Sequence, residues 1–159
     1  MQNTEKSIID LWSEVLIHSP PEIISFKVNT KKTALLILDL QDTNCNEERR
    51  PRCVTSIKVI TNLLARARKK GMLIVYSLTS SATKEQIREE MKPLENEPIV
   101  KSGVDKFYKT NLETILKERN IEQVIITGTS AHGAVLNTVT GAVARGFSVI
   151  VPIDCLSSS

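Results

Sequence analysis

The chain has 159 residues, of which 41% are hydrophobic and 25% charged, and this composition is typical of one folded domain. Its 21 Lys and Arg residues against 18 Asp and Glu residues leave a formal charge of only +3, and the scattered basic residues argue against nucleic acid as a partner. The sequence has no apolar run of membrane-spanning length, no export signal and no regular cysteine spacing, so we expect no membrane partner, no disulfide framework and a cytoplasmic location.

Apolar residues recur at helical spacing near the N-terminus, between Ile8 and Leu16. They predict an amphipathic helix over about residues 7–17, which stops before Pro20. Residues 1–30 are therefore expected to form this helix and a lead-in, and residues 31–159 the main domain. The apolar face of the helix would pack on that domain or on another subunit.

Strand patterns and helix patterns alternate through the rest of the chain. Continuous apolar runs predict strands, and apolar residues at helical spacing predict helices. The expected strands are 33–39, 73–77, 123–127 and 148–152, and the expected helices are 54–70, 83–91, 111–119 and one that opens near residue 134. This order predicts an α/β fold with a doubly wound, Rossmann-like parallel sheet and helices on both faces, in three layers.

Two strand ends carry the features that most favour a functional site. Asp39 closes the first buried strand, and Gly128 closes a later one just before the helix that opens near Ala134. A helix start directs free N–H groups toward an anion, and function collects at the carboxyl ends of parallel strands. These two segments therefore indicate one site.

Three ordered segments resemble the isochorismatase-like cysteine hydrolases, the superfamily of isochorismatase, nicotinamidase and N-carbamoylsarcosine amidase. They are LDLQDT at 38–43, IVK at 99–101 followed by Phe107 and TNL at 110–112, and GTSAHGAV at 128–135. The resemblance covers most of the chain and implies the same α/β fold. It also implies association as a homodimer or homotetramer.

The resemblance assigns a role to four residues. Asp39 would be the general base, Lys101 its cationic partner, and the backbone N–H groups of Ser130 and Ala134 the oxyanion hole, after a cis peptide at Thr129-Ser130. Relatives have the nucleophilic cysteine where this chain has Ala134. The sequence thus predicts a hydrolase site without its usual nucleophile.

Five further residues are expected in the substrate pocket: Gln41, Cys45, Phe107, His132 and Gly133. Cys45 is either an inert loop cysteine or a replacement nucleophile, and His132 is either a polar turn residue or a pocket residue.

Basic residues and the other two cysteines have plainer interpretations. The cluster at 49–52 is a solvated loop or a reader of carboxylate or phosphate at the pocket mouth. Cys53 would begin the following helix, and Cys155 would be a small buried hydrophobe.

Neither a metal nor a cofactor is expected. Zinc-dependent relatives hold the ion through an Asp-x-His-x-x-His segment after the second strand, whereas this chain has SLTSSA at 77–82. The whole sequence contains two histidines, which makes a tight zinc site improbable.

Two functions stay open. One is a metal-independent hydrolase of a small polar amide or vinyl ether, in which water or Cys45 replaces the lost thiol. The other is a catalytically inactive descendant that binds a small ligand or a partner protein in the same pocket. The alanine at 134 is either a natural loss or a substitution introduced to trap a substrate. Relatives continue past the last strand into another helix, so a C-terminal part is expected to be absent or replaced.

Overall fold

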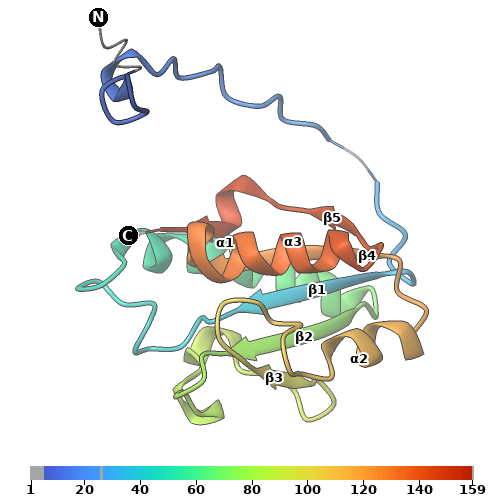
Figure 1. The fold of residues 1–159 in the computed structure, drawn as a ribbon. Helices are drawn as coiled ribbons and strands as arrows, with labels where there is room; N and C mark the ends of the chain where they lie inside the picture. Colours follow the sequence, from blue (N-terminus) through green and yellow to red (C-terminus); the bar gives the residue numbers. More distant parts are fainter. Residues whose placement is uncertain (1–5, 26, 159) are drawn as a thin grey trace, which may run out of the picture.

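The fold is a parallel sheet between two layers of helices, described by a computed structural model for residues 6–25 and 27–158 (Figure 1). The strand order is β3-β2-β1-β4-β5, with β6 paired to the end of β4. The strands are β1 (Thr33–Leu38), β2 (Leu73–Leu78), β3 (Ile99–Lys101), β4 (Gln123–Thr129), β5 (Ser148–Ile150) and β6 (Leu156–Ser157). Every pairing is parallel, so all the carboxyl ends meet at one edge of the sheet.

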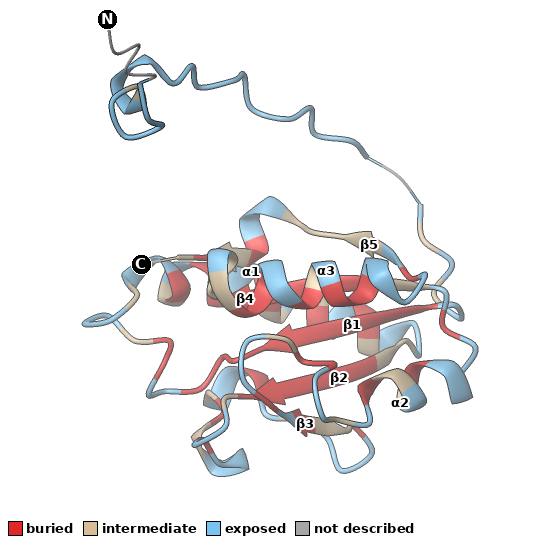
Figure 2. Cartoon of the chain, in the orientation of Figure 1, coloured by how far each residue is buried: buried red, intermediate tan, exposed pale blue. Residues whose placement is uncertain are grey.

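The central strands are buried on both faces, as their continuous apolar sequences predict (Figure 2). All six residues of β1 are buried, and β1 pairs with both β2 and β4. Alternate side chains of β1 enter opposite cores, because successive residues of a strand face opposite ways. Leu35 and Ile37 join one core, and Leu36 and Leu38 join the other.

Helices cover both faces of the sheet, which confirms the predicted fold class. The helix α1 (Pro51–Lys69) packs through Ile57, Ile60 and Leu64 on the first core. The helices α2 (Leu112–Glu118) and α3 (Leu136–Ala144) cover the second core. Crossovers of this kind bring the loops after β1, β2 and β4 to the same edge of the sheet.

One predicted helix is replaced by two short 3₁₀ turns. The pattern over 83–91 gives turns at Lys84–Gln86 and Glu89–Met91. Ile87, between them, is extended and forms an antiparallel bridge with Gln41, which interrupts any helix through this segment. The short strands β3 and β6 were not predicted, since two or three residues carry too little periodicity.

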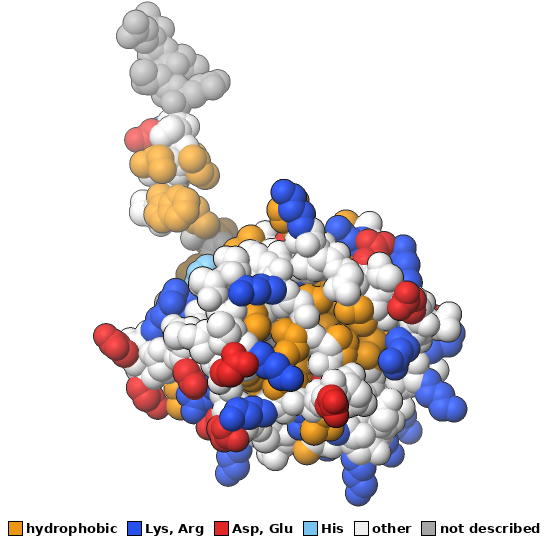
Figure 3. Space-filling model, turned by 90° about the horizontal axis from the view of Figure 1, so that it is seen from below, with side chains coloured by type: hydrophobic (Ala, Val, Ile, Leu, Met, Phe, Trp, Pro, Cys, Tyr) orange, Lys and Arg blue, Asp and Glu red, His pale blue; other side chains and the backbone are white. Residues whose placement is uncertain are grey.

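The predicted N-terminal helix is also wrong. Within residues 6–25 the one helical turn is a 3₁₀ turn at Trp12–Glu14, and Figure 1 shows this segment standing clear of the domain. Figure 3 shows hydrophobic side chains exposed on it. Its apolar side chains contact no core: Leu16 is 84% exposed and Ile17 97%. A short isolated helix is marginal in water without a surface to pack on, so helical spacing alone does not form one.

No helix among the described residues is both long enough and apolar enough to cross a membrane.

Candidate functional site

A buried ion pair lies at the carboxyl end of β1. Asp39 Oδ2 is 2.8 Å from Lys106 Nζ, and their side chains are only 4% and 0% exposed. Ser77, at the end of β2, donates a hydrogen bond of 2.9 Å from its Oγ to Asp39 Oδ1. The carboxylate is therefore held on both oxygens by neighbours from two different segments.

The lysine of this pair is not the predicted one. Lys101 ends β3 with its side chain exposed, because Val100 beside it takes the inward position of the strand. The loop after β3 returns Lys106 to the site, where its ammonium also donates to the backbone oxygens of Gly103 at 2.7 Å and Ser102 at 3.2 Å. The two lysines are five residues apart, and the course of this loop decides which of them reaches Asp39.

The turn after β4 forms the opposite side of the site. Its peptide bond between Thr129 and Ser130 is cis, as the resemblance implies. Gly128 has a φ of +116°, and a Cβ built on it would lie 2.1 Å from the backbone oxygen of Leu38. Only glycine allows β4 to lie this close to β1 before the turn.

The chain then enters a π-helical turn at Ala131–Val135, which leads into α3. Ala134 is buried in this turn and faces the cavity, where relatives would place the nucleophilic cysteine. The start of a helix presents N–H groups without intrahelical partners, so this turn suits a developing negative charge.

A cavity of about 230 Å³ lies between these segments. Its walls come from the ends of β1, β2 and β4 and from the loop after β3: Asp39, Asn44, Arg49, Arg50, Thr79, Ser80, Ser102, Gly103, Val104, Thr129, Ser130, Gly133 and Ala134. Four predicted site residues, Asp39, Ser130, Gly133 and Ala134, thus lie together. Their catalytic roles stay predictions.

The other predicted pocket residues do not line this cavity. Gln41 is buried, and its side-chain amide donates to the backbone oxygen of Asp39 at 3.1 Å and accepts from Thr79 Oγ1 at 2.8 Å. Phe107 stacks on Phe147 in the core beneath α3, with ring centroids 6.1 Å apart. The His132 side chain is 2.6 Å from Ser158 Oγ, on the outside of the turn.

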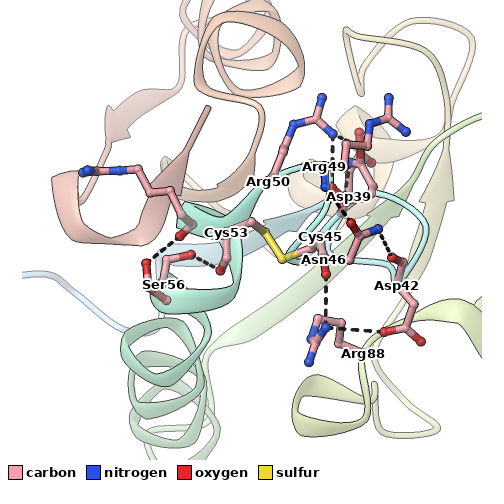
Figure 4. The surroundings of a disulfide bond; sticks show 12 residues. Asp39, Asp42, Cys45, Asn46, Arg49, Arg50, Cys53, Ser56 and Arg88 are labelled. Atoms are coloured by element: carbon pink, nitrogen blue, oxygen red, sulfur yellow. Dashed lines mark hydrogen bonds and ion pairs between the residues drawn. A yellow bond between two sulfur atoms is a disulfide. The ribbon is translucent and has the colours of Figure 1, made fainter. Parts of the chain in front are cut away.

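Cys45 is also excluded from the cavity, because it forms a disulfide with Cys53 (Figure 4). A disulfide is present although the cysteine spacing predicted no disulfide framework, and it excludes the alternative in which Cys45 is a replacement nucleophile. Cys53 lies in the first turn of α1, as predicted, but it also has this structural role. The cysteine count therefore no longer argues for a reducing location. Cys155 is free and buried, as expected, and burial raises the pKa of its thiol to about 12.

The disulfide closes the loop between β1 and α1, which carries two arginines of the cavity wall. Asn44 donates to the backbone oxygen of Asp39 at 2.9 Å, and Arg50 Nη1 donates to the backbone oxygen of Asn44 at 3.1 Å. Arg88 Nη1 donates to the backbone oxygen of Cys45 at 3.1 Å. The loop is thus fixed by side chains at several points. The predicted solvated loop at 49–52 is in fact split, because residues 51 and 52 begin α1 and Arg49 and Arg50 face the cavity.

The pKa of Asp39 depends mainly on the burial of its carboxyl group. Loss of solvation raises the pKa of Asp39 above 3.8, while the charge of Lys106 and the hydrogen bonds from Lys106 and Ser77 oppose the rise. A carboxylate with a raised pKa is a stronger base than one in water. Burial also lowers the pKa of Arg50, and the charge of Arg49 lowers it further.

No metal cluster is evident here: the described residues contain no group of three or more His, Cys, Asp or Glu side chains placed to hold an ion. After β2, where zinc-dependent relatives would supply imidazoles, Thr79 and Ser80 line the cavity. Hydroxyls alone are poor zinc ligands.

Fold and site define a class: a doubly wound α/β protein with a cavity at the carboxyl edge of its sheet. The model of the isochorismatase domain family matches residues 33–159, and the chain belongs to this family.

Individual relatives agree with this membership. The N-carbamoylsarcosine amidase of Arthrobacter sp is 38% identical over 72 residues, which is 45% of this chain but only 27% of that enzyme. The alignment thus spans well under two thirds of this relative.

Solved structures extend the likeness over the whole domain. An isochorismatase-like hydrolase from Alkaliphilus metalliredigens has a TM-score of 0.75 and 26% identity over 80% of this chain and 82% of that one. The N-carbamoylsarcosine amidase from Thermoplasma acidophilum has a TM-score of 0.74 at 20% identity, over 80% of this chain and 85% of that one. The second likeness concerns the fold alone.

Proposed function

We propose that the protein is a metal-independent hydrolase of a small polar molecule of the amide or vinyl-ether class. The observation that carries this proposal is the buried Asp39–Lys106 pair beside a cavity that also contains the helix start at Ala134. Burying two charges is costly, and removing one partner of such a pair strongly destabilises a protein. A site that keeps this arrangement at a cavity edge is a candidate for acid and base chemistry.

In this proposal a water molecule replaces the missing thiol. Ala134 and Asp39 both line the cavity, so a water between them has a carboxylate as its base. Asp39 takes one proton of the water while the oxygen attacks the substrate carbonyl carbon. The carbonyl electrons move to its oxygen, which the N–H groups of Ser130 and Ala134 stabilise.

Collapse of this tetrahedral intermediate completes the reaction. The carbonyl reforms, the bond to the amide nitrogen breaks, and the proton held on Asp39 passes to the departing amine. Lys106 keeps Asp39 oriented throughout and offsets its charge. Loss of a covalent nucleophile usually costs several powers of ten in rate, so turnover is expected to be slow.

A second function is a binding protein that uses the same cavity without turnover. The observation that favours it is Ala134 itself, because its methyl group offers neither a nucleophile nor a proton. The cavity, the ion pair and the backbone donors would then hold a ligand in the orientation of a substrate.

One pair of measurements separates the two functions. We expect the purified protein to release ammonia slowly from small primary amides, and the variant Asp39→Asn to lose that activity. Ligand-induced thermal stabilisation without any hydrolysis would favour the binding function. Hydrolysis that survives in Asp39→Asn would contradict the assignment of the base.

Self-association is a further part of the proposal. The N-terminal arm, residues 6–25, exposes Ile8, Trp12, Leu16 and Ile17, and exposed apolar groups of this kind mark interaction surfaces. We expect a homodimer or homotetramer in light scattering, and a monomer at all concentrations would contradict it.

A further inference from the structure

A second hollow, which we call the β5 groove, lies on the α1 side of the sheet at its β5 edge. Its volume is about 900 Å³, and its domain side is mainly apolar, with Leu63 of α1, Ile125 of β4, Ile150 of β5 and Ile153 just after β5. Among the described residues β5 pairs with β4 alone, so one edge of it is open. An apolar hollow beside an open sheet edge marks an interaction surface.

The two faces of the sheet are covered unequally. Both α2 and α3 contribute side chains to the second core, whereas α1 is the one α-helix of the described residues that contributes to the first. Each face of a three-layer α/β fold is normally covered by more than one helix. The β5 groove therefore lies where a further helix could pack beside α1.

The N-terminal arm carries the start of an amphipathic helix. Ser7 and Asp10 form a reciprocal capping box: the backbone N–H of Ser7 donates to Asp10 Oδ2 at 2.8 Å, and that of Asp10 donates to Ser7 Oγ at 3.3 Å. The backbone N–H of Leu11 donates to the backbone oxygen of Ser7 at 3.2 Å, which is the α-helical pattern. The helix goes no further than the turn at Trp12–Glu14, because a short helix needs a surface to pack on.

A helix completed from this start would have one apolar stripe. Its members are three, four or one residue apart and are all exposed in the single chain: Ile8, Trp12, Val15 and Leu16. Asp10 and Glu14 would lie on the opposite face. Amphipathic helices of this kind bind by laying the apolar face into a hydrophobic groove.

An extended link directs the stripe away from the groove of its own chain. Residues 21–25 line that groove, and residues 15–25 contain no helix or turn. Pro20 and Pro21 have a fixed φ, and the residue before a proline is held extended, so the link resists a reversal toward its own domain. At about 3.3 Å for each residue, such a link separates Leu16 from Pro21 by about 16 Å. Figure 1 shows the arm clear of the domain.

We propose that the apolar stripe of one copy docks as a helix in the β5 groove of a second copy, which returns its own arm in the same way. Exchange of identical segments between two copies gives a closed, symmetric dimer. The exchange rests on the self-association proposed above and adds its surface and its partner segment. It does not depend on the hydrolase chemistry.

The area available favours two contacts over one. At about 100 Å² for each apolar side chain, the four residues of one stripe cover about 400 Å², and the groove loses a similar area. Two reciprocal contacts then bury about 1,600 Å², which is the standard size of a stable interface. One contact alone buries about half of that and would be weak.

Tryptophan fluorescence on the full chain reports on the arm. Trp12 is the only tryptophan in the sequence, and its side chain is exposed in the single chain. We expect light scattering to show a dimer as the protein concentration rises, and the emission of Trp12 to move to shorter wavelength over the same range. Both changes follow from one concentration-dependent contact.

A matched pair of variants tests the groove. Ile153→Glu should weaken dimerisation by at least about thirtyfold and abolish the emission change, because an unpaired charge is costly in an apolar contact that each dimer contains twice. The control is Val143→Glu on α3, which lies outside the groove and is 59% exposed, as is Ile153. It should dimerise as the unmodified protein does. Circular dichroism establishes that both are folded.

A mixing experiment tests whether an arm enters a groove. The double variant Trp12→Glu with Leu16→Glu loses the stripe but keeps the groove, whereas Ile153→Glu keeps the stripe. Each should be a monomer alone. Their equimolar mixture should form a complex through the one remaining contact, weaker than the unmodified dimer. Its emission should shift, because the only tryptophan left belongs to the arm that docks.

The other possible arrangements give different results. A monomer at all concentrations would overturn the exchange, and a short-wavelength Trp12 emission in that monomer would mean that the arm occupies its own groove. A dimer that survives Ile153→Glu but not the loss of the stripe, with no complex on mixing, would mean that the arms pair with each other. Loss of the dimer in Val143→Glu alone would move the interface to α3. The last two results contradict the exchange while leaving self-association in place, and Asp39-dependent hydrolysis tests the proposed chemistry separately.

Discussion

The two walls of the cavity are built by different means. The turn wall, residues 128–134, takes its shape from the backbone: a glycine with a positive φ, a cis peptide and the start of a helix. The loop wall, residues 39–50, takes its shape from side chains: a disulfide, Asn44 and the arginines that hold carbonyl oxygens. A backbone wall tolerates replacement of a side chain such as that at position 134, whereas a side-chain wall does not. Because its shape comes from the backbone, the turn keeps the form of a hydrolase site while holding an alanine.

The largest effect is expected in the turn wall. Gly128→Ala places a methyl group 2.1 Å from the Leu38 backbone oxygen, at a φ that alanine disfavours. We expect a loss above about 4 kcal/mol, enough to prevent folding of a marginal domain. Soluble yield and circular dichroism measure this. The control is Gly103→Ala, whose added methyl meets no atom within 4 Å, and an equal loss there would contradict the account.

The next largest effect concerns the lysine that the loop after β3 brings between the walls. Lys106→Met leaves the Asp39 carboxylate buried and unpaired, and we expect it to lower the free energy of unfolding by about 3–5 kcal/mol. Lys101→Met is the matched control and should change it by less than about 0.5 kcal/mol. Urea unfolding followed by circular dichroism is suitable, because the single tryptophan, Trp12, lies in the exposed arm. A larger loss of stability in Lys101→Met than in Lys106→Met would instead indicate Lys101 as the partner of Asp39.

The loop wall should depend on its disulfide. Cys45→Ser with Cys53→Ser opens a loop with a sequence separation of 8, and we expect a cost of about 2.5 kcal/mol from the added freedom of the unfolded chain. Unchanged stability would show that the other contacts of the loop suffice without the bond.

Thiol titration checks the same bond without a mutation. The native protein should react with no thiol reagent at neutral pH, because Cys155 is buried and its pKa is raised to about 12. Denaturation without reductant should expose one thiol, and reduction all three cysteines of the sequence. Three thiols before reduction would mean that the disulfide is absent.

The smallest effect is the pH dependence at Asp39. Its pKa is raised on folding, so the folded state favours the protonated acid. The resulting stability is fully present below the unfolded pKa of 3.8 and is lost as the pH rises through the folded value. Relative to Asp39→Asn, which does not titrate, the unmodified protein should therefore lose stability over that range. Urea unfolding of both proteins at several pH values measures the difference in their free energies of unfolding. An unmodified protein that gains stability relative to Asp39→Asn as the pH rises would contradict this prediction.

Sequence patterns predicted the elements whose burial is continuous. The apolar runs that became β1 and β4, and the glycine turn before Ala134, were found because their residues report directly on a two-sided core and a tight turn. The helix predicted around Trp12 does not form, because its apolar residues at helical spacing have no surface to pack on. The fold class followed from the order of strands and helices.

The rest of the site depended on the courses of loops. Segments without regular periodicity decide which lysine, Lys101 or Lys106, reaches Asp39. They also decide whether Cys45 reaches Cys53. The two disulfide cysteines have Cα atoms 5.4 Å apart only because the loop folds back onto α1. No spacing rule applied to two isolated cysteines predicts that.

The most direct test of the account restores the thiol. If the cavity is a hydrolase site that lacks only its nucleophile, Ala134→Cys should form a covalent acyl intermediate with a small activated amide or ester, detected as a mass increase of the intact protein. The same variant carrying Asp39→Asn should form it far more slowly, while Ala134→Ser serves as a control for the added polar group. A thiol at position 134 that never acylates, or one that acylates equally well without Asp39, would contradict the central claim.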